Sequence, residues 1–238
     1  MKSKRAYLLP LWLGLLAMFV FSRAASASVV APGTIQLPDI FVPCPGCTLE
    51  ASVNSGPITI SNFDGSITMT LDVVSAVYAD PSNTFGAGDL DFMYQITNVS
   101  GNDSIGRVSA GVFSGFLTDV GFTFTGSALQ GGLFVDGTQE PQLVSRSATV
   151  PNNGATIGFI YNGLAPSTFG PGTASTVLII ETDATNFKAG NVNIIDDVVA
   201  SAAAFEPAAS TPTPEPASLL LLGSGLVALG TRLRRSRA

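Results

Sequence analysis

Two cysteines, Cys44 and Cys47, are the only thiols in this chain of 238 residues, and they are separated by Pro45 and Gly46. A pair at this spacing forms a local disulfide, acts as a redox couple or supplies two metal ligands. A redox thiolate needs a helix N-terminus or a nearby cation, whereas the prolines and the glycine favour a turn. We therefore expect a structural disulfide between Cys44 and Cys47 in an oxidising compartment.

Four oxygen-bearing side chains surround a short loop that contains two glycines: Asp80, Asn83, Asp89 and Asp91. Calcium binds six to eight such oxygens, and Asp89 and Asp91 share one face of a strand. The spacing is not that of an EF-hand loop. Turn chemistry together with outward-facing strand residues also explains the pattern, so we assign no metal site and expect no cofactor. Calcium binding stays open as an alternative.

Catalytic motifs are scarce in this chain. It has no histidine, which excludes a Ser-His-Asp triad, a Cys-His dyad and histidine metal ligands. The 17 acidic residues offer the carboxylate pair of a glycosidase by number alone, and no motif assembles a nucleophile, a base and an orienting group. We expect a protein that is not an enzyme, with a secreted hydrolase as the least favoured alternative.

Charge is distributed very unevenly along the chain. Eight of the 11 basic residues lie near the two ends, which leaves Arg107, Arg146 and Lys188 among 17 acidic residues in the middle. The middle of the chain is therefore strongly acidic and has no basic patch that could bind nucleic acid. Divalent cations and basic surfaces are the partners that its charge favours.

The first 27 residues have the pattern of a secretory signal peptide. A basic opening is followed by an apolar run that ends at Phe21, and then by the small residues Ala25 and Ala27. This order predicts cleavage by signal peptidase after Ala27, with Ser28 as the new N-terminus. A permanent membrane anchor is the alternative, but the small residues before Ser28 favour cleavage.

The last 31 residues divide into three parts. Residues 208–216 form a linker that ends in Pro214-Glu215-Pro216, residues 217–231 form a short apolar helix, and residues 232–238 are basic. The apolar block of this helix, residues 217–230, is about 21 Å long, against about 30 Å of membrane hydrocarbon, so it is a poor permanent anchor. Arginines remain in the cytoplasm, which places the acidic middle outside the inner membrane. These arginines are Arg232, Arg234, Arg235 and Arg237.

This tail resembles the PEP-CTERM sorting signal of Gram-negative bacteria, in its Pro-Glu-Pro tripeptide, its apolar run over 218–226 and its arginine-rich end. The resemblance implies recognition by an exosortase, a membrane cysteine transpeptidase, and cleavage near Pro214, Glu215 and Pro216. A tail of this kind is also labelled an ice-binding protein C-terminal domain, which describes the tail alone. Proteins of the family often accompany exopolysaccharide and biofilm functions, and the middle of this chain resembles their uncharacterised ectodomains.

Residues 28–207 alternate apolar and polar residues with a period of two, which predicts strands. Val, Ile, Thr and Phe are frequent, and Gly, Asn, Asp and Pro separate the runs. We expect an all-β ectodomain, an antiparallel β-sandwich of immunoglobulin-like or jelly-roll type. One helical turn is expected over 201–205. The expected strands are 57–62, 66–78, 89–98, 106–113, 119–126, 132–135, 142–149, 155–162, 174–182 and 192–199.

These observations predict an exported structural or adhesive protein of the cell surface or of the extracellular matrix, in association with biofilm or exopolysaccharide. The alternative is a carbohydrate- or calcium-binding module. The expected partners are signal peptidase, the exosortase, the inner membrane for a limited time and exopolysaccharide, and nucleic acid is not among them.

Overall fold

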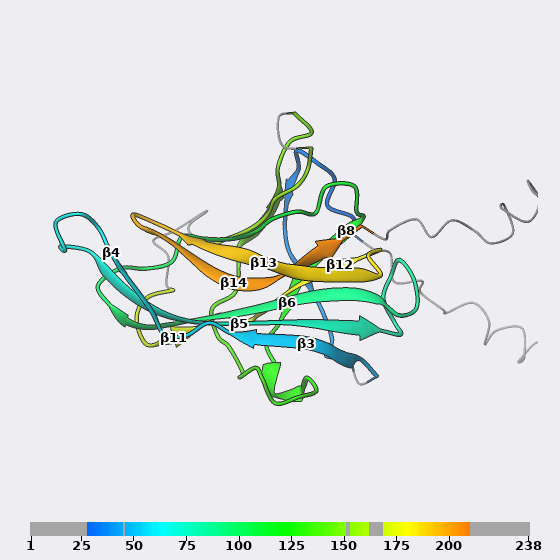
Figure 1. Cartoon of the computed structure of the whole chain (residues 1–238), viewed down its shortest axis with the longest axis horizontal. Coiled ribbons are helices and arrows are strands. Elements are labelled where there is room, and N and C mark those ends of the chain that lie inside the picture. The colour runs from blue at the N-terminus through cyan, green and yellow to red at the C-terminus, as the bar shows by residue number, and fades with distance from the viewer. Residues whose placement is uncertain (1–27, 45, 151–152, 162–168, 210–238) are drawn as a thin grey trace, which may run out of the picture.

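The computed structural model describes residues 28–44, 46–150, 153–161 and 169–209 (Figure 1). The predicted signal peptide, residues 1–27, lies outside the described residues. The Pro-Glu-Pro motif, the sorting helix and the basic tail do too. Within the described part of the chain, no helix is long and apolar enough to cross a membrane.

Two β-sheets make up the described domain. In the larger sheet all neighbouring strands are antiparallel except β2, which runs parallel to β8. Two short strands lie outside the main order: β4 pairs with β5, and β11 pairs with β6. Its order is β2 (Asp39–Ile40), β8 (Thr118–Thr123), β12 (Val177–Thr182), β6 (Asp89–Gly101), β5 (Thr68–Asp80) and β3 (Thr48–Asn54), with β4 (Ile58–Ser61) and β11 (Thr173–Ala174) beside them. The smaller sheet, antiparallel throughout, has the order β1 (Ile35–Gln36), β9 (Leu143–Arg146), β10 (Ile157–Ile160), β7 (Arg107–Ala110), β13 (Asn186–Ile195) and β14 (Val199–Ala208).

The main core lies between the two sheets. Phe92 and Ile96 of the larger sheet belong to one buried cluster with Phe159, Val192 and Ile194 of the smaller sheet. Successive strand residues point to opposite faces, which is why the alternating residues of the sequence supply this cluster. The prediction of an all-β sandwich is therefore confirmed.

A second, smaller core covers the outer face of the larger sheet. Tyr78, Met93 and Ile179 supply its floor, and Cys47 and Phe134 pack on top of them. The cover comes from two stretches of chain, the segment around the cysteines and the loop that follows the short 3-10 helix Gly126–Ala128. Because both faces of β12 are thus covered, all six of its residues are buried, as its nearly continuous apolar run predicts.

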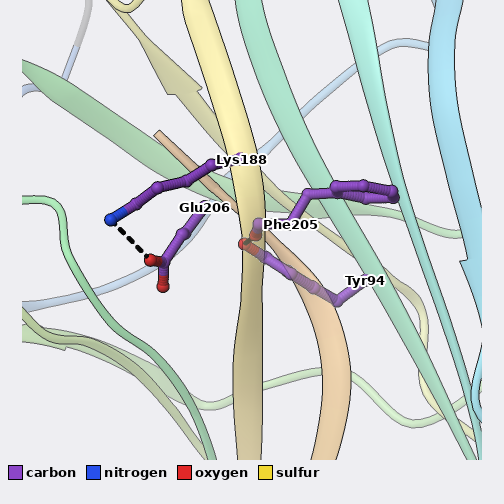
Figure 2. A network of polar contacts seen from close by, with 4 residues as sticks. All are labelled: Tyr94, Lys188, Phe205 and Glu206. Atoms are coloured by element: carbon purple, nitrogen blue, oxygen red, sulfur yellow. Dashed lines mark hydrogen bonds and ion pairs between the residues drawn. The ribbon is translucent and has the colours of Figure 1, made fainter. Parts of the chain in front are cut away.

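The outer edge of β14 is tied to the larger sheet by side chains. The hydroxyl of Tyr94 donates to the carbonyl of Phe205 at 2.8 Å (Figure 2). The N–H of Phe205 donates to Oγ of Ser75 at 3.2 Å. On the other side of the hairpin, Lys188 of β13 pairs with Glu206 of β14 at 3.1 Å (Figure 2). Side chains thus satisfy both backbone groups of Phe205, on an edge that would otherwise be open to another strand.

Several details of the predicted elements are wrong. Residues 132–135 form no strand, because the amide of Gln95 bonds both backbone groups of Val135 and takes the place of a partner strand. The expected strand 192–199 covers the end of β13, a turn and the start of β14, and the expected helical turn 201–205 is part of β14. The strands β1, β2 and β3 were not predicted. In β14 every second residue from Ala200 to Ala204 is buried, so packing overrides the helical preference of alanine.

Candidate functional site

A row of acidic side chains crosses the outer face of the larger sheet. Asp91 of β6 lies opposite Glu181 of β12, and Glu181 lies opposite Asp119 of β8. Residues that are directly opposite share one face of a sheet. Asp91 is also opposite Tyr78 of β5, and Asp80 follows Tyr78 by two residues on that face. We refer to Asp80, Asp91, Glu181 and Asp119 as the carboxylate row.

The carboxylate row is buried and has no basic partner. Its members are 2% to 8% exposed. Among the described residues, no lysine or arginine forms an ion pair with the row. The buried Arg146 gives its hydrogen bonds to carbonyl oxygens and to the hydroxyl of Thr118. Buried carboxylates without a cation are costly, so the row needs protons or a bound cation.

Burial and neighbouring acidic groups raise the pKa values of Asp91, Glu181 and Asp119. Burial raises the pKa of Asp91 well above its ordinary value, and the charges of Glu181 and Asp80 add to this. Burial also raises the pKa of Glu181, against the hydrogen bond from Thr84, which lowers it. Burial and the carboxyl group of Asp39 raise the pKa of Asp119 to about 7. The row therefore favours proton or cation uptake at neutral pH.

The loop between β5 and β6 supplies polar contacts to three members of the row. The amide nitrogen of Asn83 donates to Asp91 at 2.9 Å, and the hydroxyl of Thr84 donates to Glu181 at 3.0 Å. The hydroxyl and backbone N–H of Ser82 both donate to Asp80 at 2.6 Å. These bonds orient one oxygen of each carboxylate and hold the loop against the sheet.

A cavity of about 10 Å³ lies where Asp80, Asp91 and Glu181 meet, under the chain segment 41–44. One oxygen from each of the three carboxylates lies within 4.8 Å of the other two. Oxygens that share a calcium ion at 2.3–2.6 Å are separated by up to about 5 Å. The residues present thus fit one divalent cation of the hard, oxygen-binding type.

The structure changes the membership of the calcium cluster suggested by the sequence. It brings Asp80, Asn83 and Asp91 together, but Asp89 is partly exposed, and its pKa is raised by burial and by the charge of Asp183, which is not a member of the row. The expectation of an outward-facing strand residue is wrong for Asp91, which is buried. Asp80 and Asn83 do make turn contacts, because they accept the backbone N–H groups of Ser82 and Phe85. Sequence reasoning missed Glu181 and Asp119. Glu181 carried a usable signal, because it is the one charged residue in the apolar run of β12.

Cys44 and Cys47 form a disulfide, with their Cα atoms 5.5 Å apart. The Sγ atom of Cys44 lies 3.1 Å from Oδ1 of Asp80. A disulfide sulfur has no proton to donate, so this is a packing contact. It places the disulfide loop directly over one end of the carboxylate row.

A separate open groove of about 400 Å³ lies beside the domain's Glu50 and Asn186. Glu50 is the single carboxylate among its lining residues, and the lining contains one aromatic residue, Phe187. The three tyrosines of the described domain are all buried. The groove therefore offers neither a facing carboxylate pair nor a sugar-stacking tyrosine.

Residues 212–235 match the PEP-CTERM protein-sorting motif. The match contains Pro214, Glu215 and Pro216 together with the apolar run and three of the four arginines. This chain is therefore an exported protein that carries a PEP-CTERM sorting signal, and an exosortase at the membrane sorts it to the cell envelope. No curated protein and no solved structure matches the chain.

Proposed function

We propose that this protein is a non-enzymatic structural or adhesive component of the cell surface or the extracellular matrix, associated with exopolysaccharide. The observation that supports the proposal best is the charge of the sandwich that the sorting signal exports. Of its three basic side chains, Arg146 is buried, so the surface is dominated by carboxylates. Such a surface stays soluble outside the cell and cross-links through cations or basic partners.

A location experiment tests this proposal. Cells that produce the native chain are separated into inner membrane, periplasm, outer surface and matrix, and the domain is quantified in each fraction. We expect it in the surface and matrix fractions, with weaker matrix cohesion in cells that lack the chain. Recovery from the periplasm alone, or unchanged cohesion without the chain, would contradict the proposal.

The carboxylate row favours a second candidate function, binding of calcium or a similar divalent cation. Three buried carboxylates converge on a cavity the size of one ion, and Oδ1 of the adjacent Asp119 is buried without a hydrogen-bond partner. A cation at this point would bind Asp80, Asp91 and Glu181 and lock the disulfide loop over the sheet. Bound calcium would then hold the outer face of the larger sheet and the disulfide loop together in a matrix protein.

Calcium titration of the purified exported chain tests the second candidate. We expect millimolar or tighter binding and a rise in the unfolding midpoint in calcium compared with chelator. Asp91→Asn should remove the rise, whereas Asp64→Asn, at an exposed turn, should leave it unchanged. Equal midpoints in calcium and chelator for the native chain would reject the cation site.

A further inference from the structure

The first described residues of the chain are docked on β8. The backbone N–H of Ser28 donates to Oδ2 of Asp119 at 3.2 Å, and Val29 forms an antiparallel bridge with Asp119. The N–H of Val30 then donates to the carbonyl of Thr118 at 2.9 Å. The three residues that follow the predicted signal peptide are therefore part of the fold.

Other contacts fix the position of Ser28. The amide nitrogen of Gln36 donates to the carbonyl and the hydroxyl of Ser28 at 3.2 and 3.0 Å. Arg146 donates to the carbonyl of Val30 at 3.1 Å, and Val30 is fully buried. Gln36 thus holds Ser28 directly, and Arg146 holds the chain two residues further on, so that the nitrogen of Ser28 stays beside Asp119.

Asp119 is a buried carboxylate that lacks a positive partner. It is 3% exposed, and its Oδ1 atom has no hydrogen-bond partner among the described residues. The side chains that act on it, Asp39 and Glu181, are both acidic, and the carboxyl group of Asp39, which lies within hydrogen-bond reach, raises the pKa of Asp119 further. Arg146 contacts Thr118, whose side chain points to the opposite face of β8. The position next to Asp119 is therefore a site for a positive charge.

Cleavage after Ala27 would create a positive charge at this position. Hydrolysis of the bond between Ala27 and Ser28 consumes one water and leaves a carboxylate on Ala27 and an ammonium group on Ser28. An α-amino group has a pKa of about 8, so it is charged at neutral pH. The ammonium has three N–H donors in place of one, enough for Oδ2 and for the unpartnered Oδ1 of Asp119.

We propose that removal of the signal peptide completes the fold, because the new ammonium group of Ser28 is the counter-ion of Asp119. In the uncleaved precursor the amide of Ser28 leaves this carboxylate unneutralised, and the domain is less stable. Cleavage at this bond therefore couples export to full stability. The inference rests on the predicted cleavage position and not on the proposed matrix role.

Selective carbamylation of the exported chain tests this inference. The chain after residue 27 contains a single lysine, Lys188, so Lys188→Arg leaves the ammonium of Ser28 as the one primary amine. Cyanate converts it to a neutral urea that keeps an N–H donor. We expect carbamylation to raise the unfolding equilibrium constant at least about tenfold, as measured in guanidinium chloride. In an added Asp119→Asn background the effect should fall below about twofold.

Matched variants make the outcome decisive. Asp136→Asn removes a carboxylate whose side chain is exposed and should keep the full effect of carbamylation. Equal unfolding midpoints for the free and carbamylated chains that retain Asp119 would overturn the inference, as would an exported chain that begins elsewhere than at Ser28. If the Asp119→Asn chain does not fold, the rate of carbamylation is measured instead. We expect the docked amine of Ser28 to react with cyanate at least about tenfold more slowly in the native chain than in the unfolded chain. Equal rates would overturn the inference.

Discussion

At the scale of single residues, the carboxylate row makes stability depend on pH in a direction that is unusual for carboxylates. Most paired carboxylates have lowered pKa values and stabilise a fold as pH rises. Asp91 and Glu181 have raised pKa values, chiefly through burial. The folded state therefore binds more protons than the unfolded chain, and this contribution is fully present below the unfolded pKa of about 4. It is lost as pH rises toward the folded-state pKa values.

We therefore predict that Asp91→Asn stabilises the cation-free domain at neutral pH. The asparagine side chain has a similar shape but no charge to bury, and each pKa unit corresponds to about 1.4 kcal/mol. We expect a gain of at least about 1 kcal/mol at pH 7 in chelator, and little or no gain at pH 4. Unfolding in guanidinium chloride across this pH range measures both values.

Asp64→Asn is the matched control for this prediction. Hydrogen bonds from Ser66 lower the pKa of Asp64. The ionised Asp64 therefore stabilises the fold, and this contribution to stability is lost only as the pH falls into the acid range. A native chain whose stability in chelator rises steadily from pH 4 to pH 7, with no gain from Asp91→Asn, would show that the row bears no uncompensated charge.

At the scale of elements, the hydrogen bond from Tyr94 of β6 to Phe205 of β14 joins the two sheets. We predict that Tyr94→Phe destabilises the domain by about 1–3 kcal/mol, because it leaves the partly buried carbonyl of Phe205 without its donor. Tyr161→Phe is the matched control, since the buried hydroxyl of Tyr161 has no hydrogen-bond partner among the described residues. That change should be neutral or stabilising. Equal losses for the two variants would show that the Tyr94 bond contributes nothing specific.

Sequence reasoning predicted the elements far better than the contacts between them. The period of two is a local property, and it located β5, β6, β8 and β12 to within a few residues. The failures have non-local causes. Gln95 replaces a strand partner at Val135, and the alanines of β14 are strand residues because they pack on the larger sheet.

The candidate site shows the same limit. The loop residues Asp80 and Asn83 were predictable because they are close in sequence to Asp91. Glu181 and Asp119 join them only through the register of β6, β12 and β8, which no local pattern specifies. Burial decides whether such acids are solvated surface residues or an unneutralised cluster, and burial here depends on the disulfide segment over the sheet.

At the scale of the whole molecule, processing at the two ends connects the domain to its destination. The sorting motif at 212–235 follows directly on the described domain, whose last strand ends at Ala208. We predict that Glu215→Ala, or removal of the four C-terminal arginines, leaves unprocessed precursor in the inner membrane. Glu140→Ala, at an exposed position of the domain, should mature normally. Normal maturation of the Glu215→Ala chain would contradict the role given to the motif.

The most direct test of the account is the intact mass of the native protein, purified from the fractions of its own cells. We predict a chain that begins at Ser28 and ends close to Pro216, with any additional mass reporting a lipid or glycan added during sorting. A chain that still ends at Ala238 would show that the apolar segment is a permanent anchor. The domain would then be a tethered periplasmic module, which contradicts export to the surface or the matrix.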